Sequence, residues 1–161
     1  MPTLAFNKRA NFDYEIKDKF EAGIMLLGYE VKAVKTGHID LKGSYVSLKS
    51  QNKTQKTQKI KLPEVYLINA HIPLYKHAGI VKSYNPTRPR KLLVKKKEIK
   101  HLIGKKHEQG LTLVPIRMYT KRSLIKLEFG VGKGKKKIDK REDIKKKDID
   151  RRIQSALKIR N

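Results

Sequence analysis

Residues 12–26, with the sequence FDYEIKDKFEAGIML, carry the pattern that predicts the fold. Their apolar side chains fall mostly on even positions, and only Asp18 interrupts the even-numbered series. Successive side chains of a β-strand point to opposite faces, so this period of two predicts one long strand with a buried face. Gly23 is a candidate for a bulge or a bend in that strand.

The neighbouring segments predict more strands and a few short helices. We expect a helix over 27–37, strands over 44–48 and 64–72, a helix around 99–104, and a hairpin of strands over 111–120 and 124–131. A Lys-rich loop, Lys49–Lys61, separates the first two of these strands, and we assign it no function. About six antiparallel strands with two or three short helices favour a mainly β, small closed barrel of the oligonucleotide-binding (OB) type over a parallel sheet.

The charge of the chain indicates an anionic partner. The 161 residues include 40 Lys and Arg against 15 Asp and Glu, a net charge of +25. Nucleic acid suits that charge better than an anionic membrane surface. No apolar run approaches the ~20 residues that span a membrane, and the first residues lack a signal-peptide stretch, so we expect a cytoplasmic protein.

The charge and the aromatic residues divide the chain into two predicted parts. Residues 131–161 carry 13 Lys and Arg against 5 acids, a net of +8, and no aromatic residue. Residues 1–130 carry 27 against 10, a net of +17, with all seven Tyr and all four Phe. We therefore predict an RNA-binding barrel over 1–130 and a basic flexible tail over 131–161 that is disordered when free. The Gly- and Lys-rich segment 130–136 is expected to be a hinge, whose lysines can also follow phosphates.

The sequence contains no recognisable catalytic or metal-binding pattern. The absence of cysteine excludes disulfides and thiolate ligands, and the five histidines do not have zinc-site spacing. We expect no catalytic residue, no metal and no cofactor. A generic RNA-binding or ribosomal protein and an enzyme acting on nucleic acid remain the alternatives. Four tyrosines can either pack in the core or stack on RNA bases: Tyr29, Tyr45, Tyr84 and Tyr119.

Several motifs in order make the chain resemble one family. They are Asn7-Lys8-Arg9-Ala10, Phe20-Glu21-Ala22-Gly23-Ile24, Gly28-Tyr29-Glu30-Val31-Lys32, Gly43-Ser44-Tyr45-Val46, Pro86-Thr87-Arg88-Pro89-Arg90-Lys91-Leu92-Leu93, and Gly132-Lys133-Gly134-Lys135-Lys136 followed by Asp139-Lys140-Arg141. With these the chain resembles the bacterial SsrA-binding protein (small protein B) family. The resemblance implies an OB-type barrel that binds the tRNA-like part of transfer-messenger RNA. It also implies delivery of that RNA to stalled ribosomes, which starts trans-translation and its peptide tagging.

The resemblance also implies which residues bind RNA. The family's RNA-binding positions match Asn7, Glu21 and Leu93. Our candidates for phosphate contacts are Lys8, Arg9, Lys32, Lys35, Arg88, Arg90 and Lys91. The tail motif for the small-subunit decoding region matches Lys133, Lys135, Lys136, Asp139, Lys140 and Arg141.

The far end of the tail is implied to become helical in the empty mRNA channel. Its apolar stripe would consist of Ile149, Ile153, Ala156 and Leu157. Family members commonly carry Tyr or His where this chain has Ile138, a side chain that can make an apolar contact there but cannot stack as an aromatic ring does.

Overall fold

The computed structural model describes residues 2–50, 62–79, 81, 83–106 and 110–159. Residues 51–61 of the Lys-rich loop lie outside the described residues, as do the side chains of residues 106, 137, 138 and 156–159. The elements in chain order are β1 (Thr3–Phe6), α1 (Ala10–Asp13), β2 (Tyr14–Ile24), α2 (Gly28–Lys35), β3 (Tyr45–Lys49), β4 (Glu64–Ile68), β5 (Arg90–Leu93), α3 (Lys96–Lys106), β6 (Leu111–Lys121), β7 (Leu124–Gly134) and α4 (Lys137–Ile159).

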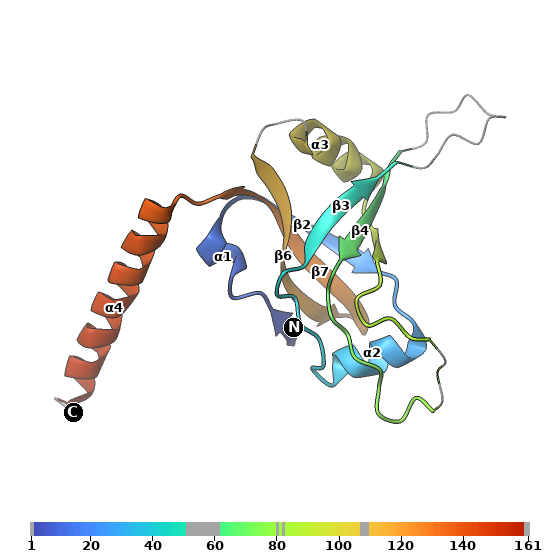
Figure 1. Ribbon diagram of the computed structural model, residues 1–161, viewed down its shortest axis with the longest axis horizontal. Helices are drawn as coiled ribbons and strands as arrows, with labels where there is room; N and C mark the ends of the chain where they lie inside the picture. Colours follow the sequence, from blue (N-terminus) through green and yellow to red (C-terminus); the bar gives the residue numbers. More distant parts are fainter. Residues whose placement is uncertain (1, 51–61, 80, 82, 107–109, 160–161) are drawn as a thin grey trace.

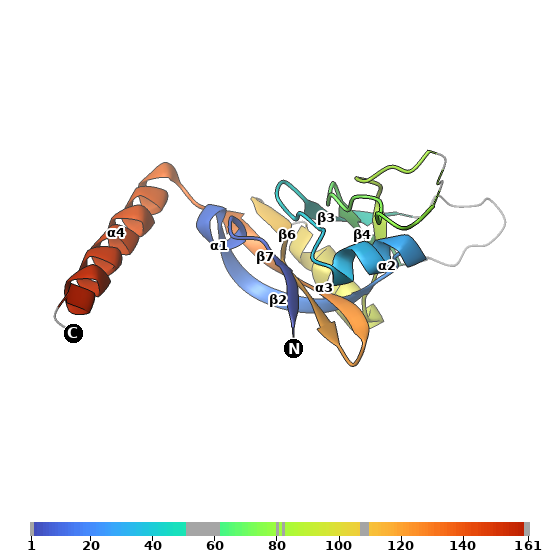
Figure 2. The ribbon, with the colours of Figure 1, turned by 90° about the horizontal axis from the view of Figure 1, so that it is seen from below.

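In the described part of the chain, the strands form one antiparallel sheet that closes on itself. Its order is β1-β6-β3-β4-β5-β2-β7, and an additional β6–β7 pairing joins the two flanks into a ring with β1 outside it. Helices α2 and α3 lie at opposite ends of this barrel, and α4 projects away from it on the side of α1 (Figures 1 and 2). The prediction of a mainly β, closed OB-type barrel is confirmed.

The main hydrophobic core fills the inside of the barrel. Leu67 of β4, Met118 of β6, and Phe129 of β7 are fully buried in it. Val34 of α2 and Leu102 of α3 are also 0% exposed and belong to the same cluster. Each helix therefore seals one end of the barrel by inserting apolar side chains, which is the main source of its stability.

A second, smaller core lies on the outside of the barrel, beneath α1. Ala10 of α1 packs there against Val114 and Ile116 of β6, with Tyr14 and Ile16 of β2 beside them. A bulge between Ile16 and Asp18 makes this possible. An extra residue in one strand reverses which face the following side chains occupy. The even positions of β2 therefore lie under α1 before the bulge and inside the barrel after it.

Gly130 and Gly132 are positions of close approach in β7. A Cβ atom on Gly130 would lie 2.6 Å from Ile16 Cγ2 and 2.9 Å from the Asp18 carbonyl oxygen. The prediction of a flexible hinge over 130–136 is wrong for these residues, because they are buried and paired with β2. The barrel accordingly extends to Gly134, four residues beyond the predicted boundary.

A buried ion-pair network fastens α2 to the segment that leads into β5. Glu30 of α2 is 0% exposed. Its carboxylate accepts hydrogen bonds from Arg88 at 2.5 and 2.9 Å and from Arg90 at 2.9 and 3.1 Å. The backbone N–H of Leu27 and the Tyr84 hydroxyl complete its partners, at 2.8 and 3.2 Å. Charge-assisted bonds of this kind balance the cost of burying the charges.

The same contacts set the ionisation of Glu30. Burial acts to raise the pKa of the Glu30 carboxyl, while the hydrogen bonds from Arg88 and Leu27 and the charge of Arg90 lower it. The hydrogen bonds and charges outweigh the effect of burial, so the pKa of Glu30 lies below its ordinary value and the group stays charged.

Other details differ from the sequence predictions. Phe12 lies in α1, a single helical turn closed by the bond from Asp13 N to Arg9 O at 2.8 Å, so the long strand begins only at Tyr14. The predicted strand over 64–72 ends at Ile68, where Asn69 adopts a left-handed backbone with φ of 57°. Strands β1 and β5 were not predicted, because four residues are too few for a clear alternation.

The C-terminal segment is a helix, α4, where the sequence predicts a flexible tail. It is rich in Lys and Arg, which have high helix propensity, and it contains no Gly or Pro. Disorder of this segment in the free protein stays a prediction.

We predict that Glu30→Gln lowers the free energy of unfolding at pH 7 by about 3–5 kcal/mol, because Arg90 then keeps a buried charge without its counter-charge. A folded-state pKa below the unfolded one means that this stabilisation exists above about pH 4.5 and disappears as the pH falls further. Urea denaturation of both proteins between pH 7 and pH 3 should show that the difference between their free energies of unfolding becomes smaller on acidification. Glu15→Gln, on the exposed side of β2, is the control and should cost under ~0.5 kcal/mol.

We predict that Gly130→Ala destabilises the barrel by about 1–3 kcal/mol, because the new methyl group would contact the Asp18 backbone and Ile16. Gly134→Ala is the matched control in the same strand, since nothing lies within 4 Å of its added carbon. Thermal unfolding of the two variants measures the difference, and equal melting temperatures would contradict the close approach.

Candidate nucleic-acid interface

The turn between β1 and α1 presents the first group of predicted RNA-binding residues. Lys8 and Arg9 are exposed there, whereas Asn7 is only 8% exposed. The Asn7 amide Nδ2 donates to the Pro115 carbonyl at 2.9 Å, and its Oδ1 accepts from the Arg9 N–H at 3.2 Å. Both ends of this amide have backbone partners, so Asn7 holds the turn that displays the two cations.

The outer face of β2 and β5 carries the second group. Gly23 of β2 pairs with Leu93 of β5, and Glu21 lies two residues earlier on the same outward face. Leu93 is 56% exposed, and its neighbour on that face, Lys91, forms an ion pair with Glu64. The structure therefore places Glu21, Lys91 and Leu93 on one outward face, although about 70 residues separate Glu21 from the other two in the sequence.

Glu21 holds two side chains of β6 in place. It accepts hydrogen bonds from the Tyr119 hydroxyl and from Lys121 Nζ, the latter at 3.1 and 3.3 Å. The bonds from Tyr119 and Lys121 lower the pKa of Glu21, and burial together with the bond to Glu21 raises the pKa of the Tyr119 phenol to about 12. Glu21 thus stays negative on the basic surface, and the buried Tyr119 beneath it stays protonated.

Helix α2 and the arginine segment form the third group. Lys32 and Lys35 are exposed on α2, and Lys32 Nζ lies 5.8 Å above the Tyr75 ring. Arg88 is 29% exposed and its guanidinium binds Glu30. These residues lie around the buried network described above.

Arg90 does not belong to the exposed surface. Its side chain is 0% exposed, and its guanidinium also donates to the carbonyls of Ala70, Pro86 and Arg88 at 2.7, 2.8 and 3.2 Å. Together with Glu30 and Tyr84 these partners occupy all its N–H groups. The prediction that Arg90 contacts phosphate is wrong in this structure, because its donors hold the fold.

The start of α4 is anchored on α1. The Lys135 N–H donates to the Asp13 carbonyl at 2.9 Å, and Lys140 Nζ donates to Asp13 Oδ1 at 2.7 Å. Lys140 and Lys147 also lie 5.9 and 5.6 Å from the centre of the Phe12 ring. Asp13 and Phe12 therefore set the direction in which the helix leaves the barrel (Figure 2).

The remaining tail residues are distributed along the exit from β7. Lys133, Lys136 and Arg141 are exposed, and Asp139 Oδ2 accepts from the Lys136 N–H at 3.1 Å as a helix cap. Lys135 Nζ bonds Asp143 at 2.8 Å, and this bond lowers the pKa of Asp143. Ile138, Ala156 and Leu157 are placed as helical backbone, but their side chains lie outside the described residues.

The four tyrosines separate into different roles. Tyr84 donates to the Ile72 carbonyl at 2.7 Å and packs edge-on against Tyr29, and Tyr119 is 5% exposed. Tyr45 is 46% exposed and has no hydrogen-bonded partner among the described residues, so it is the one whose ring is most available.

Sequence reasoning missed Glu30, the centre of the buried network. The one available signal was its position three residues after Leu27 at the start of a predicted helix, as in a capping box. Leucine in place of Ser or Thr at the first position conceals that pattern.

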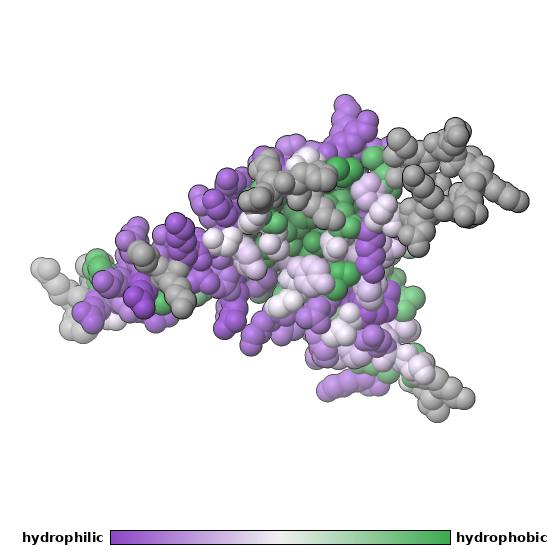
Figure 3. Space-filling view, turned by 45° about the horizontal axis from the view of Figure 1, so that its top comes forward, coloured by the Kyte–Doolittle hydropathy of each residue, from purple (hydrophilic) through white to green (hydrophobic). Residues whose placement is uncertain are grey.

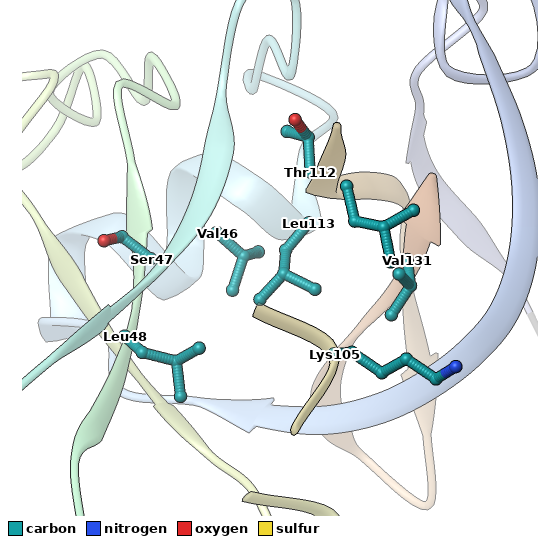
Figure 4. Close-up of a pocket in the computed structure, with 8 residues that line it drawn as sticks. Val46, Ser47, Leu48, Lys105, Thr112, Leu113 and Val131 are labelled. Carbon is teal, nitrogen blue, oxygen red and sulfur yellow. The ribbon is translucent and has the colours of Figure 1, made fainter. Parts of the chain in front are cut away.

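A small apolar gap opens where β3 and β6 pair only through Val46 and Leu113. Figure 4 shows these side chains with Val131 and Lys105 around the gap, whose volume is about 170 Å³. That volume is below the ~300 Å³ at which ligand pockets begin, so the gap is an imperfection of barrel closure. Figure 3 shows that hydrophilic side chains dominate α4, while the visible apolar area lies over the barrel.

In the part of the chain that the structure describes, no three His, Asp or Glu side chains are grouped as metal ligands. No described helix has the length and apolarity needed to cross a membrane.

Comparison with known proteins shows which family this chain is similar to. The family model for SmpB protein matches residues 4–159. The SsrA-binding protein of Thermosipho africanus (strain TCF52B) is 46% identical over 159 residues, which cover 98% of each chain. That of Alkaliphilus metalliredigens (strain QYMF) is 45% identical over 155 residues, 96% of this chain and 90% of its own.

A solved structure described as "tmRNA-SmpB: a journey to the center of the bacterial ribosome" has the same fold. Its TM-score is 0.61 at 38% identity, over 83% of this chain and 85% of that one. Because the family model and these relatives match almost the whole length, the chain belongs to the SmpB family of SsrA-binding proteins.

Proposed function

We propose that this protein is an RNA-binding adaptor that binds the tRNA-like part of transfer-messenger RNA and delivers it to stalled ribosomes for trans-translation. The observation that carries this proposal is the match to SsrA-binding proteins over 98% of the chain. The structure named for tmRNA and SmpB in the bacterial ribosome supports the same pair of partners.

The charge distribution supports an RNA partner on physical grounds. The chain has a net charge of +25, and the exposed cations lie on three separate parts of the barrel and along α4. Lys and Arg side chains neutralise phosphates and release counterions, which provides affinity without reading sequence. A folded RNA with a defined shape contacts such dispersed cations at once, whereas a short single strand does not.

On the barrel, the proposed RNA contacts are the exposed residues of the three groups. They are Lys8, Arg9, Glu21, Lys32, Lys35, Arg88, Lys91 and Leu93, with Lys121 held by Glu21. Asn7 acts by holding its turn. Glu21 is a negative group on a positive surface, so its role is to orient Tyr119 and Lys121 and to accept a base N–H.

On the tail, the proposed partner is ribosomal RNA of the decoding region and the mRNA channel. Lys133, Lys136 and Arg141 are exposed, and α4 presents Ile149 and Ile153 one helical turn apart at 55% and 53% exposure. A basic helix of this kind suits a channel lined with phosphates. The adaptor acts by binding alone, without catalysis, and in the cytoplasm, where its ribosomal partner works.

We predict that Glu21→Arg weakens binding of the tRNA-like part by roughly tenfold, because the substitution removes the acceptor that holds Tyr119 and Lys121. Glu15→Arg makes the same charge change at another exposed position of β2, on the other side of the bulge, and is the matched control. Filter binding at about 0.15 M salt with tRNA competitor measures both affinities. Equal affinities of the two variants would contradict the role of Glu21.

We predict that ending the chain after Lys136 leaves binding of the tRNA-like part nearly unchanged and abolishes peptide tagging. The cut keeps β7, which ends at Gly134, and removes α4. Tagging is measured in cell-free translation of a message without a stop codon.

Two variants test, in the same assay, whether tagging requires the helical conformation of α4 or only its charges. Ile149→Pro keeps every charge but interrupts α4, so it should lose tagging, whereas Ile149→Ala should retain most of it. Undiminished tagging by the shortened chain would refute the assignment of α4.

A further inference from the structure

A pocket on the outside of the barrel remains after the proposed contacts are assigned. Its volume is about 300 Å³, at the lower end of the ~300–1,000 Å³ typical of small-ligand sites. One wall comes from α1 and its flanks, the opposite wall from the turn that enters β3, and the rest from β6. The lining residues are Asn7, Arg9, Ala10, Asp13, Tyr14, Gly43, Ser44, Tyr45, Thr112 and Val114.

The pocket combines an apolar base with available polar groups. Ala10 and Val114 belong to the outer core and are at most 4% exposed. Among the described residues, the phenols of Tyr14 and Tyr45 and the Thr112 hydroxyl make no hydrogen bond. Asp13 uses Oδ1 for Lys140, and its second oxygen has no partner in that part of the chain.

The charges around the pocket favour a polyanion. Arg9 lines it and is exposed without a side-chain partner among the described residues, and Lys8 is beside it. On the other side of α1, Lys140 and Lys147 lie over Phe12. Positive charge therefore lies close to the pocket, and the exposed Arg9 is the cation within it that suits the phosphate of a nucleotide.

We infer that this pocket holds one unstacked nucleotide of the bound RNA, with its base against the Tyr45 ring and its phosphate at Arg9. An aromatic ring supplies stacking to any base, and the neighbouring hydroxyls and the Asp13 oxygen take the polar edge of the base or the ribose. This inference rests on the proposed function, and it adds Tyr45, Tyr14 and Thr112 to the RNA contacts. The pocket is on the same side of the barrel as the tail anchor, because Asp13 both lines the pocket and binds Lys140.

The test uses the whole chain and a transcript of the tRNA-like part of transfer-messenger RNA. Tyr45→Ala should weaken binding roughly tenfold, whereas Tyr45→Phe keeps the ring and should stay within about twofold. Phe6→Ala is the control, because Phe6 is 50% exposed, similar to Tyr45 at 46%, and does not line the pocket. It should bind as the unchanged protein does.

A second variant fills the pocket while Tyr45 itself is left unchanged. Thr112→Phe places a ring at an exposed strand position that tolerates aromatic residues, and it should also weaken binding. Ultraviolet crosslinking of the complex should attach a nucleotide to the peptide that contains Tyr45. Thermal melts confirm that the variants are folded.

The outcomes separate the two hypotheses. Full affinity of folded Tyr45→Ala and Thr112→Phe, or an equal loss in Phe6→Ala, would overturn the nucleotide pocket and leave the proposed function standing. Failure of the unchanged protein to prefer this transcript over an ordinary tRNA would overturn the proposed function itself.

Discussion

The buried carboxylate of Glu30 is the interaction on which the rest of this structure depends. It neutralises two guanidinium groups that lie 58 and 60 residues away in the sequence, and one of these, Arg90, is entirely enclosed. A buried cation is tolerated only with a counter-charge and a full set of acceptors, so α2 and the entry to β5 must meet at one position. Because Arg90 begins β5, this meeting also sets where β5 enters the ring between β4 and β2.

Helix α1 is short, yet it connects the outer pocket, the turn that carries Lys8 and Arg9, and the start of α4. Its Ala10 covers the outer core made possible by the bulge in β2, and the turn before it displays Lys8 and Arg9. Its last residue, Asp13, holds Lys135 through its carbonyl and Lys140 through its carboxylate. A change in α1 therefore affects the pocket, the exposed turn and the direction of α4 together.

The few acidic residues of this basic chain serve mainly to position the basic ones. Arg117 is paired with Glu128, Lys91 with Glu64, Lys121 with Glu21, and Lys135 with Asp143. Exposed pairs such as these add little to stability. Their effect is to limit where long basic side chains reach, which converts a diffuse positive charge into cations at defined places on the surface. That order suits recognition of a folded RNA by its shape.

The order of residues along the chain was sufficient to predict the class of fold, most of its helices and strands, and the family. Alternation, turn residues and ordered motifs are local properties, so they survive in the linear sequence. Only the tertiary structure decided that Arg90 is a buried structural residue while Arg88, two residues earlier, stays partly exposed. It alone decided that Tyr14 and Phe20, both even-numbered in one strand, face opposite sides of the barrel wall. Burial and face depend on contacts between residues distant in sequence and on one bulge, and no local pattern specifies either.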